Sequence, residues 1–138
     1  MGSISLWRYA ENTSNYPGWN ISADSTGADS LIELLHCLKS DGTGATRTVL
    51  LTPPDSSLLA IPNNKGGKAK YIAAEKLRLL VSDNTSTWYF PSEASLVPLT
   101  FGSDWFDALE QGLARIKPHQ GDYSIGSSSE DQLQLWFW

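Results

Sequence analysis

Hydrophobic and polar residues alternate most clearly between residues 75 and 91. Two runs there place apolar side chains at every second position: Leu77, Leu79 and Val81 in the first, Trp88 and Phe90 in the second. Alternation with a period of two is typical of strands that bury one face. Asp83-Asn84 lies between the runs, and both residue types tolerate the positive φ of a two-residue turn. The stretch therefore predicts a β-hairpin.

The position of the turn sets the register that we expect in this hairpin. Leu79 would pair with Trp88, and Leu77 with Phe90, so that these apolar pairs cover a core. On the opposite face Arg78 would lie near Tyr89. That second face is expected to be solvated or partly covered.

Two longer segments have the spacing of amphipathic helices. The first starts at a capping-box pattern, Thr26 followed by Asp29, and ends at Gly42, which suits a left-handed cap. The second starts at Ser103 and ends before Pro118. Each has one apolar stripe, made of Leu31, Ile32, Leu34, Leu35 and Leu38 in the first and of Trp105, Phe106, Leu109, Leu113 and Ile116 in the second. We expect both helices to lie against the sheet that contains the hairpin.

The other apolar segments are short and bounded by turn-forming residues, as strands are. They comprise residues 4–9, 19–22, 46–52, 57–61, 69–72, 95–101, 121–126 and 132–138. Segment 46–52 is apolar and β-branched enough for a central strand, whereas Pro98 favours an edge position or a bulge. The sequence thus predicts an α+β fold: a mostly antiparallel β-sheet of about six to eight short strands with two amphipathic helices packed on one face. Residues 1–138 are expected to form a single α+β domain.

Composition and charge limit the class of protein. Cys37 is the single cysteine, which excludes a disulfide framework and fits a reducing compartment. The sequence shows no secretory signal pattern and no apolar stretch long enough to span a bilayer, so we expect a cytoplasmic protein without a membrane partner. A formal net charge of −5 argues against a nucleic-acid partner and is compatible with a basic protein partner.

Residue patterns typical of catalysis are missing from the sequence. There is no Gly-x-Ser-x-Gly elbow, and His119 with Asp122 lies in turn-rich sequence that implies no triad geometry. Asp104 and Asp107 are explained by the positive end of the second helix. We predict no catalytic residue, no metal ligand and no cofactor. The sequence favours a protein that is not an enzyme, without deciding the point.

A basic, glycine-rich segment supplies one candidate site. Lys65, Lys68 and Lys70 lie close together in sequence, and Tyr16 and Trp19 flank an earlier Pro-Gly turn. Backbone N–H groups and lysines can surround an anion, but the spacing here is not that of a P-loop. Two interpretations remain: a pocket for an anionic ligand, or a solvated loop beside aromatic residues that cap the core.

Aromatic residues supply a second candidate site. Trp136, Trp138 and Tyr89 have the parity opposite to that of the inferred core positions. A row of exposed aromatic side chains is typical of an interface. The competing interpretation is that loops or the first helix cover this face as well.

The leading hypothesis is a small, non-catalytic, intracellular interaction domain that binds a basic protein partner or a second copy of itself as a homodimer. An immunity or inhibitor protein that neutralises a basic toxin is a special case of this hypothesis. The alternative is a binder of a small anionic ligand, or an unrecognised enzyme, with a pocket near the basic loop.

Overall fold

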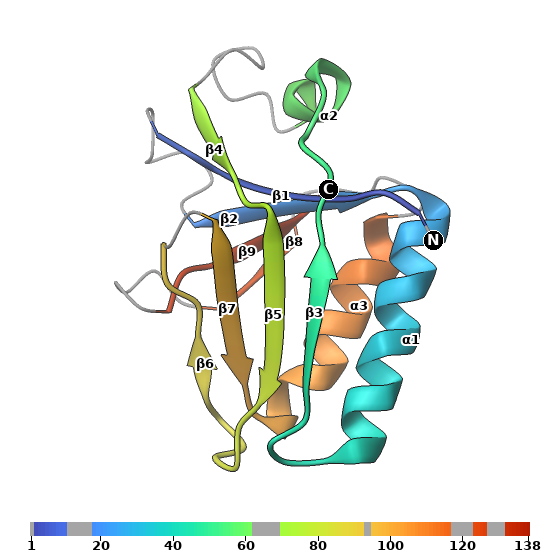
Figure 1. Ribbon diagram of the computed structural model, residues 1–138, viewed down its shortest axis with the longest axis vertical. Helices are drawn as coiled ribbons and strands as arrows, with labels where there is room; N and C mark the ends of the chain where they lie inside the picture. Colours follow the sequence, from blue (N-terminus) through green and yellow to red (C-terminus); the bar gives the residue numbers. More distant parts are fainter. Residues whose placement is uncertain (1, 11–17, 62–69, 93–94, 117–122, 127–131) are drawn as a thin grey trace.

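The computed structural model describes residues 2–10, 18–61, 70–92, 95–116, 123–126 and 132–138, and it confirms the predicted α+β class. Within these residues, nine strands form two sheets, where the sequence predicted one. The two sheets run crosswise to each other in Figure 1. No helix in the described part of the chain is long and apolar enough to cross a membrane.

The five-stranded sheet has the order β4-β1-β2-β9-β8. Its strands are β4 (Tyr71–Ala73), β1 (Ile4–Tyr9), β2 (Trp19–Ala23), β9 (Leu135–Phe137) and β8 (Tyr123–Ile125). β9 runs parallel to β2 and antiparallel to β8. β9, the last strand along the chain, therefore lies inside the sheet, with β8 as the edge strand on one side and three strands on the other.

The four-stranded sheet has the order β3-β5-β7-β6. Its strands are β3 (Thr46–Leu50), β5 (Lys76–Val81), β7 (Leu96–Phe101) and β6 (Trp88–Tyr89). β5 and β7 are parallel, while the other two pairs are antiparallel. Each sheet therefore contains one parallel pair, β2 with β9 in the first and β5 with β7 in the second, so both sheets are mixed.

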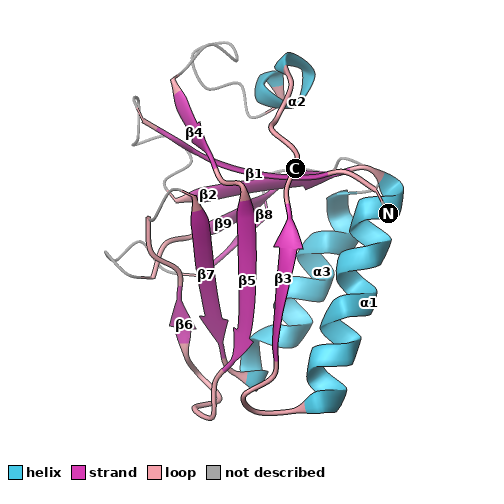
Figure 2. Ribbon diagram, in the orientation of Figure 1, coloured by secondary structure: helices cyan, strands magenta, loops and turns pink. Residues whose placement is uncertain are grey.

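Two long helices lie side by side on one side of the molecule (Figure 2). α1 (Ser25–Asp41) and α3 (Phe106–Ile116) were both expected from the sequence, and a 3-10 turn at Ser103–Trp105 leads into α3. A short third helix, α2 (Ser56–Ala60), lies on the opposite side of β1 and β2 from the other two. The five-stranded sheet therefore has helices on both of its faces.

Both sheets and both long helices contribute to the main hydrophobic core. The expected inward positions of β5 and β6 are confirmed, since Leu77, Leu79, Val81 and Trp88 are all buried, as is Phe90 just beyond β6. They pack with residues of the other sheet and of the helices, including Ile21, Phe137, Leu31, Leu35, Leu109 and Leu113. The alternation of apolar residues is therefore a correct guide to which face of each strand is buried.

The predicted hairpin is wrong in its pairing. β5 and β6 are not neighbours, because β7 lies between them and hydrogen-bonds to both. The connection is wider than a two-residue turn: the Asn84 side chain accepts from the Ser86 N–H at 3.2 Å, and Ser82 Oγ donates to Thr87 Oγ1 at 3.1 Å. This wider loop places β5 and β6 far enough apart for β7 to lie between them.

Three other predicted segments differ in the structure. Segment 57–61 was expected to be a strand but is mostly α2, because the Asp55 carboxylate caps a helix by accepting from the Leu58 N–H at 2.9 Å. β3 was expected to be central but is an edge strand. Pro98 was expected at an edge and lies on the interior strand β7, at a level where β6 does not reach, since β6 pairs only with Thr100 and Phe101.

The start of α1 also differs from the prediction. Asp24, and not Thr26, is the N-cap, and its carboxylate accepts from the Gly27 N–H at 2.7 Å. The end is as expected, because Gly42 has a positive φ of 85° and its N–H donates to the Leu38 carbonyl oxygen at 3.0 Å.

A substitution in α3 tests the contact between this helix and the five-stranded sheet. A Cβ atom at Gly112 would lie 2.5 Å from ring atoms of Phe137, which is closer than two carbon atoms can approach. We expect Gly112→Ala to lower the free energy of unfolding by about 1 to 3 kcal/mol despite the better helix propensity of alanine. Urea unfolding measures this change.

The matched control is Gln111→Ala, on the exposed side of the same helix. This variant should unfold within about 0.5 kcal/mol of the parent protein. A Gly112→Ala variant as stable as its control would contradict the packing of α3 against β9.

Candidate functional site

The structure does not gather the described members of the predicted binding residues into one site. Tyr16, Lys65 and Lys68 lie outside the described residues, so the proposed pocket around the basic loop has no described geometry. Trp19 is fully buried, and its indole N–H donates to the Pro91 carbonyl oxygen at 2.9 Å. Lys70 is exposed at the start of the segment that leads into β4.

Trp136 and Trp138 do not form an exposed row, which corrects the expectation of an aromatic surface on this strand. Trp138 is only 4% exposed and Trp136 is half-buried. Their rings stack at a centroid distance of 6.1 Å in a second hydrophobic cluster with Trp7, Tyr9 and the residues of α2. The reason is that α2 covers the face of the five-stranded sheet that points away from the main core.

A buried polar side chain orients the second cluster. Asn20 is fully buried in β2, where its Oδ1 accepts from the Trp138 indole N–H at 2.9 Å and its Nδ2 donates to the Trp7 carbonyl oxygen at 3.4 Å. The Trp7 indole N–H itself has no hydrogen-bond partner in the described part of the chain. Asn20 therefore ties the two tryptophans that flank it to the middle of the sheet.

A cleft of about 420 Å³ opens beside the second cluster, where α1 and α2 begin. Four serines and two aspartates line it, together with three apolar residues: Ser3, Ser5, Ser22, Ser25, Asp24, Asp55, Ala23, Leu58 and Ile116. Both carboxylates already cap helices. No lysine or arginine is among these lining residues, so the described part of the cleft is unsuited to an anion.

The pKa of Asp24 is lowered from its ordinary value by its hydrogen bonds. The larger cause is the bond from the Gly27 N–H, and the second is the bond from the Ser3 N–H at 3.1 Å. Both bonds favour the ionised carboxylate. This side chain is therefore a structural cap that joins the chain before β1 to the start of α1.

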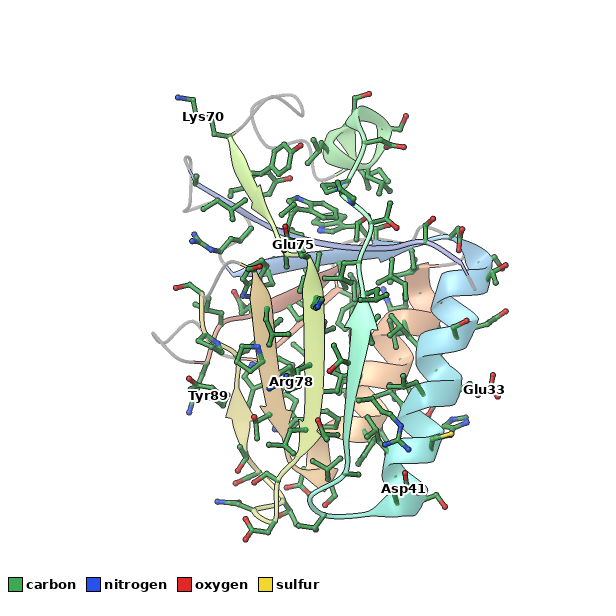
Figure 3. The ribbon with its side chains drawn as sticks, viewed as in Figure 1. Glu33, Asp41, Lys70, Glu75, Arg78 and Tyr89 are labelled. Atoms are coloured by element: carbon green, nitrogen blue, oxygen red, sulfur yellow. The ribbon has the colours of Figure 1, made fainter. Side chains whose placement is uncertain are left out.

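The outer face of the four-stranded sheet has no covering element among the described residues. Its rows follow from the strand pairing: Thr46, Leu80, Thr100 and Tyr89 in the first, Thr48, Arg78 and Pro98 in the second, Leu50, Lys76 and Leu96 in the third. All ten side chains are exposed or half-buried, and Leu50 is 67% exposed. Figure 3 shows Arg78 and Tyr89 on this face. Two predicted binding residues thus share one surface.

A groove of about 200 Å³ runs between β3 and α1, at the edge of this face. Its apolar lining comes from Ile4, Leu31, Leu34, Val49 and Leu50, and its polar lining from Ser30 and Thr48. We call it the β3–α1 groove. Arg47 Nη2 and Asp41 Oδ2, which are 2.7 Å apart, form an ion pair between the start of β3 and the end of α1.

Sequence reasoning missed this groove because it placed β3 in the middle of a sheet. The apolar, β-branched composition of β3 is usual for central strands, and it led to the wrong prediction of a central position. Leu50 followed by Leu51 favoured burial, yet Leu50 lies on the outer face. Which strand forms an edge depends on contacts distant in sequence.

The described residues offer little for catalysis or metal binding. No three His, Cys, Asp or Glu side chains of the described ranges are grouped so that they could hold a metal ion. His36 Nε2 lies 2.9 Å from Glu110 Oε1, at an exposed contact between α1 and α3. This contact joins two helices on the surface. No hydrogen bond or ion pair in the described part of the chain connects it to a nucleophilic side chain.

Comparison with known proteins identifies no relative: no family model, curated protein or solved structure matches the chain.

Asn20→Ala tests the role of the buried amide. Removing the acceptor leaves the Trp138 indole N–H unpaired inside the protein, so we expect the free energy of unfolding to fall by about 1 to 3 kcal/mol. Ser22→Ala is the control, because this buried hydroxyl makes only a long bond of 3.4 Å to the Trp138 carbonyl oxygen. Equal stability losses in urea unfolding would show that Asn20 has no special role.

Asp24→Ala tests the cap through the pH dependence of stability. A carboxylate whose folded-state pKa is lowered stabilises the protein above its unfolded-state pKa of about 3.9, and this contribution is lost as the pH falls through the lower folded-state value. Asp24→Ala should therefore be less stable than the parent at pH 7, and the difference should shrink below about pH 4. A difference that stays constant from pH 7 to pH 2 would contradict this account.

Proposed function

We propose that this protein is a small, non-catalytic interaction domain that binds another protein through the outer face of its four-stranded sheet. The observation that carries the proposal is the contrast between the two sheets. The five-stranded sheet has helices on both faces, whereas no described element covers the outer face of the four-stranded sheet. A contiguous surface that contains exposed large apolar residues is typical of interaction sites.

The chemistry of the face also suits a protein partner. Leu50, Leu80 and Leu96 give it apolar area, while Arg78 and Tyr89 are of residue types enriched at interfaces. The strands hold these side chains in fixed rows, which lowers the entropy that binding would cost.

The size of the face says how a partner must bind. Three strands of five or six residues, each about 17 to 20 Å long, and the two-residue β6 lie about 4.8 Å apart and present roughly 300 Å². Stable interfaces bury about 800 Å² on each partner. A partner therefore has to contact neighbouring surface as well, and the β3–α1 groove adjoins this face.

The alternative function, binding of a small anionic ligand, has less support. The cleft beside α1 and α2 has a suitable volume, but carboxylates and serines line its described part. Lys65 and Lys68, which motivated the alternative, lie outside the described residues.

The double variant Arg78→Glu, Tyr89→Ala tests the proposed surface. The domain is immobilised, exposed to a lysate of the cells from which it comes, and each retained protein is identified and then titrated in pure form. We expect at least about tenfold weaker binding of that protein by the double variant, because charge reversal and loss of an aromatic anchor act at the same face. Light scattering of the parent and of the double variant, each alone in solution, compares how strongly they bind a second copy of themselves.

Gln111→Ala on α3 is the control, since it changes exposed surface on a different element. It should bind like the parent. Equal affinity of the parent and the double variant for every retained protein, with no change in self-association, would rule out the outer face as the binding surface.

A further inference from the structure

We propose that the partner contributes an extended segment that adds a strand to the free edge of β3, places apolar side chains in the β3–α1 groove, and directs a basic residue at Glu33. This inference rests on the proposed function and specifies the partner's chemistry. Addition of a strand to a sheet edge is a general mode of peptide recognition, in which backbone hydrogen bonds supply affinity and alternate side chains supply specificity.

The backbone of β3 has unpaired groups at its outer edge. The Leu51 N–H donates to the Glu75 carbonyl oxygen at 3.0 Å, and the Val81 N–H donates to the Ala45 carbonyl oxygen at 3.0 Å. Odd-numbered residues therefore bond to β5 along this antiparallel pair, and even-numbered residues point the other way. Thr48 and Leu50 thus each direct one N–H and one C=O away from the sheet. Thr46 directs its N–H the same way, but its carbonyl oxygen accepts from Arg47 Nη1 at 2.8 Å.

The middle of this edge, at Thr48 and Leu50, lacks the features that usually protect an edge strand. Natural proteins block such edges with lysines, prolines, bulges or covering segments. The charged residue within β3 is Arg47, which pairs with Asp41 and occupies only the Thr46 carbonyl oxygen at the start of the edge. Just past the end of the strand, the Thr52 N–H donates to the Ile4 carbonyl oxygen at 2.8 Å. The prolines come later, at Pro53-Pro54, after the strand has ended. Thr48 and Leu50 are exposed, so an added strand can reach their backbone groups.

The β3–α1 groove explains why the added segment should be apolar at alternate positions. A new strand beside β3 would lie about 4.8 Å from it, and every second side chain would point to the side where α1 lies. There the groove presents Leu31 and Leu34 of α1 together with Ile4 and Val49. Apolar side chains of the partner would be removed from water in this groove.

The exposed carboxylate of Glu33 on α1 indicates a basic residue in the added segment. At 100° per residue, Asp41 lies about 20°, Cys37 about 60° and Glu33 about 100° from Leu34 on one side of α1, and Lys39 lies about 140° away on the other side. Glu33 is exposed and projects from α1, and no ion pair among the described residues includes it. A lysine or arginine next to the apolar positions would meet this carboxylate.

A second copy of the chain fits the edge less well than a separate basic segment. Pairing of β3 with β3 of another copy would bring both α1 helices alongside the same pair of edges. Each helix carries Glu33 on that flank, so like charges would approach each other. Self-pairing is therefore an outcome that the experiment must distinguish.

The test uses the full chain and a synthetic peptide of alternating valine and threonine with a lysine at each end, capped at both termini. Amide hydrogen exchange followed by NMR is the main measurement. With saturating peptide, exchange at Thr46, Thr48 and Leu50 should slow at least about tenfold, while the Arg47 and Val49 amides, already bonded to β5, should change little. The same peptide with glutamates at its ends should bind at least about tenfold more weakly.

Two variants separate the backbone from the charge contribution. Thr48→Pro removes an outward N–H without removing a bond to β5, and Thr48→Val keeps that N–H as its control. Glu33→Lys should weaken binding of the lysine peptide at least about tenfold and improve binding of the glutamate peptide. Asp107→Lys makes the same charge change on α3 and should leave both affinities unchanged. The Glu33 variant keeps the test decisive if Thr48→Pro does not fold.

Three results would overturn the inference. The first is no binding of the lysine peptide up to about 1 mM. The second is binding that alters residues of the outer face, such as Arg78 and Tyr89, without protecting the β3 amides. The third is protection of those amides in a dimer that forms without peptide, which would assign the edge to a second copy. The first two leave the proposed function standing, because the Arg78 and Tyr89 double variant tests it separately.

Discussion

Burial of β9 on both of its faces is the constraint on which the rest of the structure depends. Phe137 lies in the main core against Gly112 of α3. Trp136 on the other face of β9, and Trp138 just after the strand, lie in the second cluster, where Asn20 Oδ1 accepts from the Trp138 indole N–H. Because β9 is an interior strand of the five-stranded sheet, both clusters are anchored to one backbone. Neither face of that sheet is left as a broad surface for a partner.

This arrangement directs attention to the other sheet. One face of the four-stranded sheet completes the main core, while the other face and the β3 edge have no described covering element. Rigid strands present side chains in fixed rows, and an edge strand adds unpaired backbone groups. The outer face and the β3–α1 groove meet at Leu50, so a partner that contacts both need not rearrange the domain.

Local pattern was enough to identify which side chains are buried within most strands and helices. The alternation of Leu77, Leu79 and Val81 predicted the inward face of β5, and the helical stripe predicted the buried side of α3. Pairing was not predictable in the same way. Insertion of β7 between β5 and β6 depends on residues about 20 positions apart, whose preference for each other leaves no periodic signal.

The candidate site was the least predictable feature, because exposure is a property of the assembled fold. The sequence by itself determined the α+β class, the two long helices and the inward positions of their stripes, since these depend on spacing between near neighbours. Only the tertiary structure decided that Trp138 is buried and that β3 is an edge strand beside α1. Those outcomes depend on which distant elements cover each face, and a short stretch of sequence does not encode that choice.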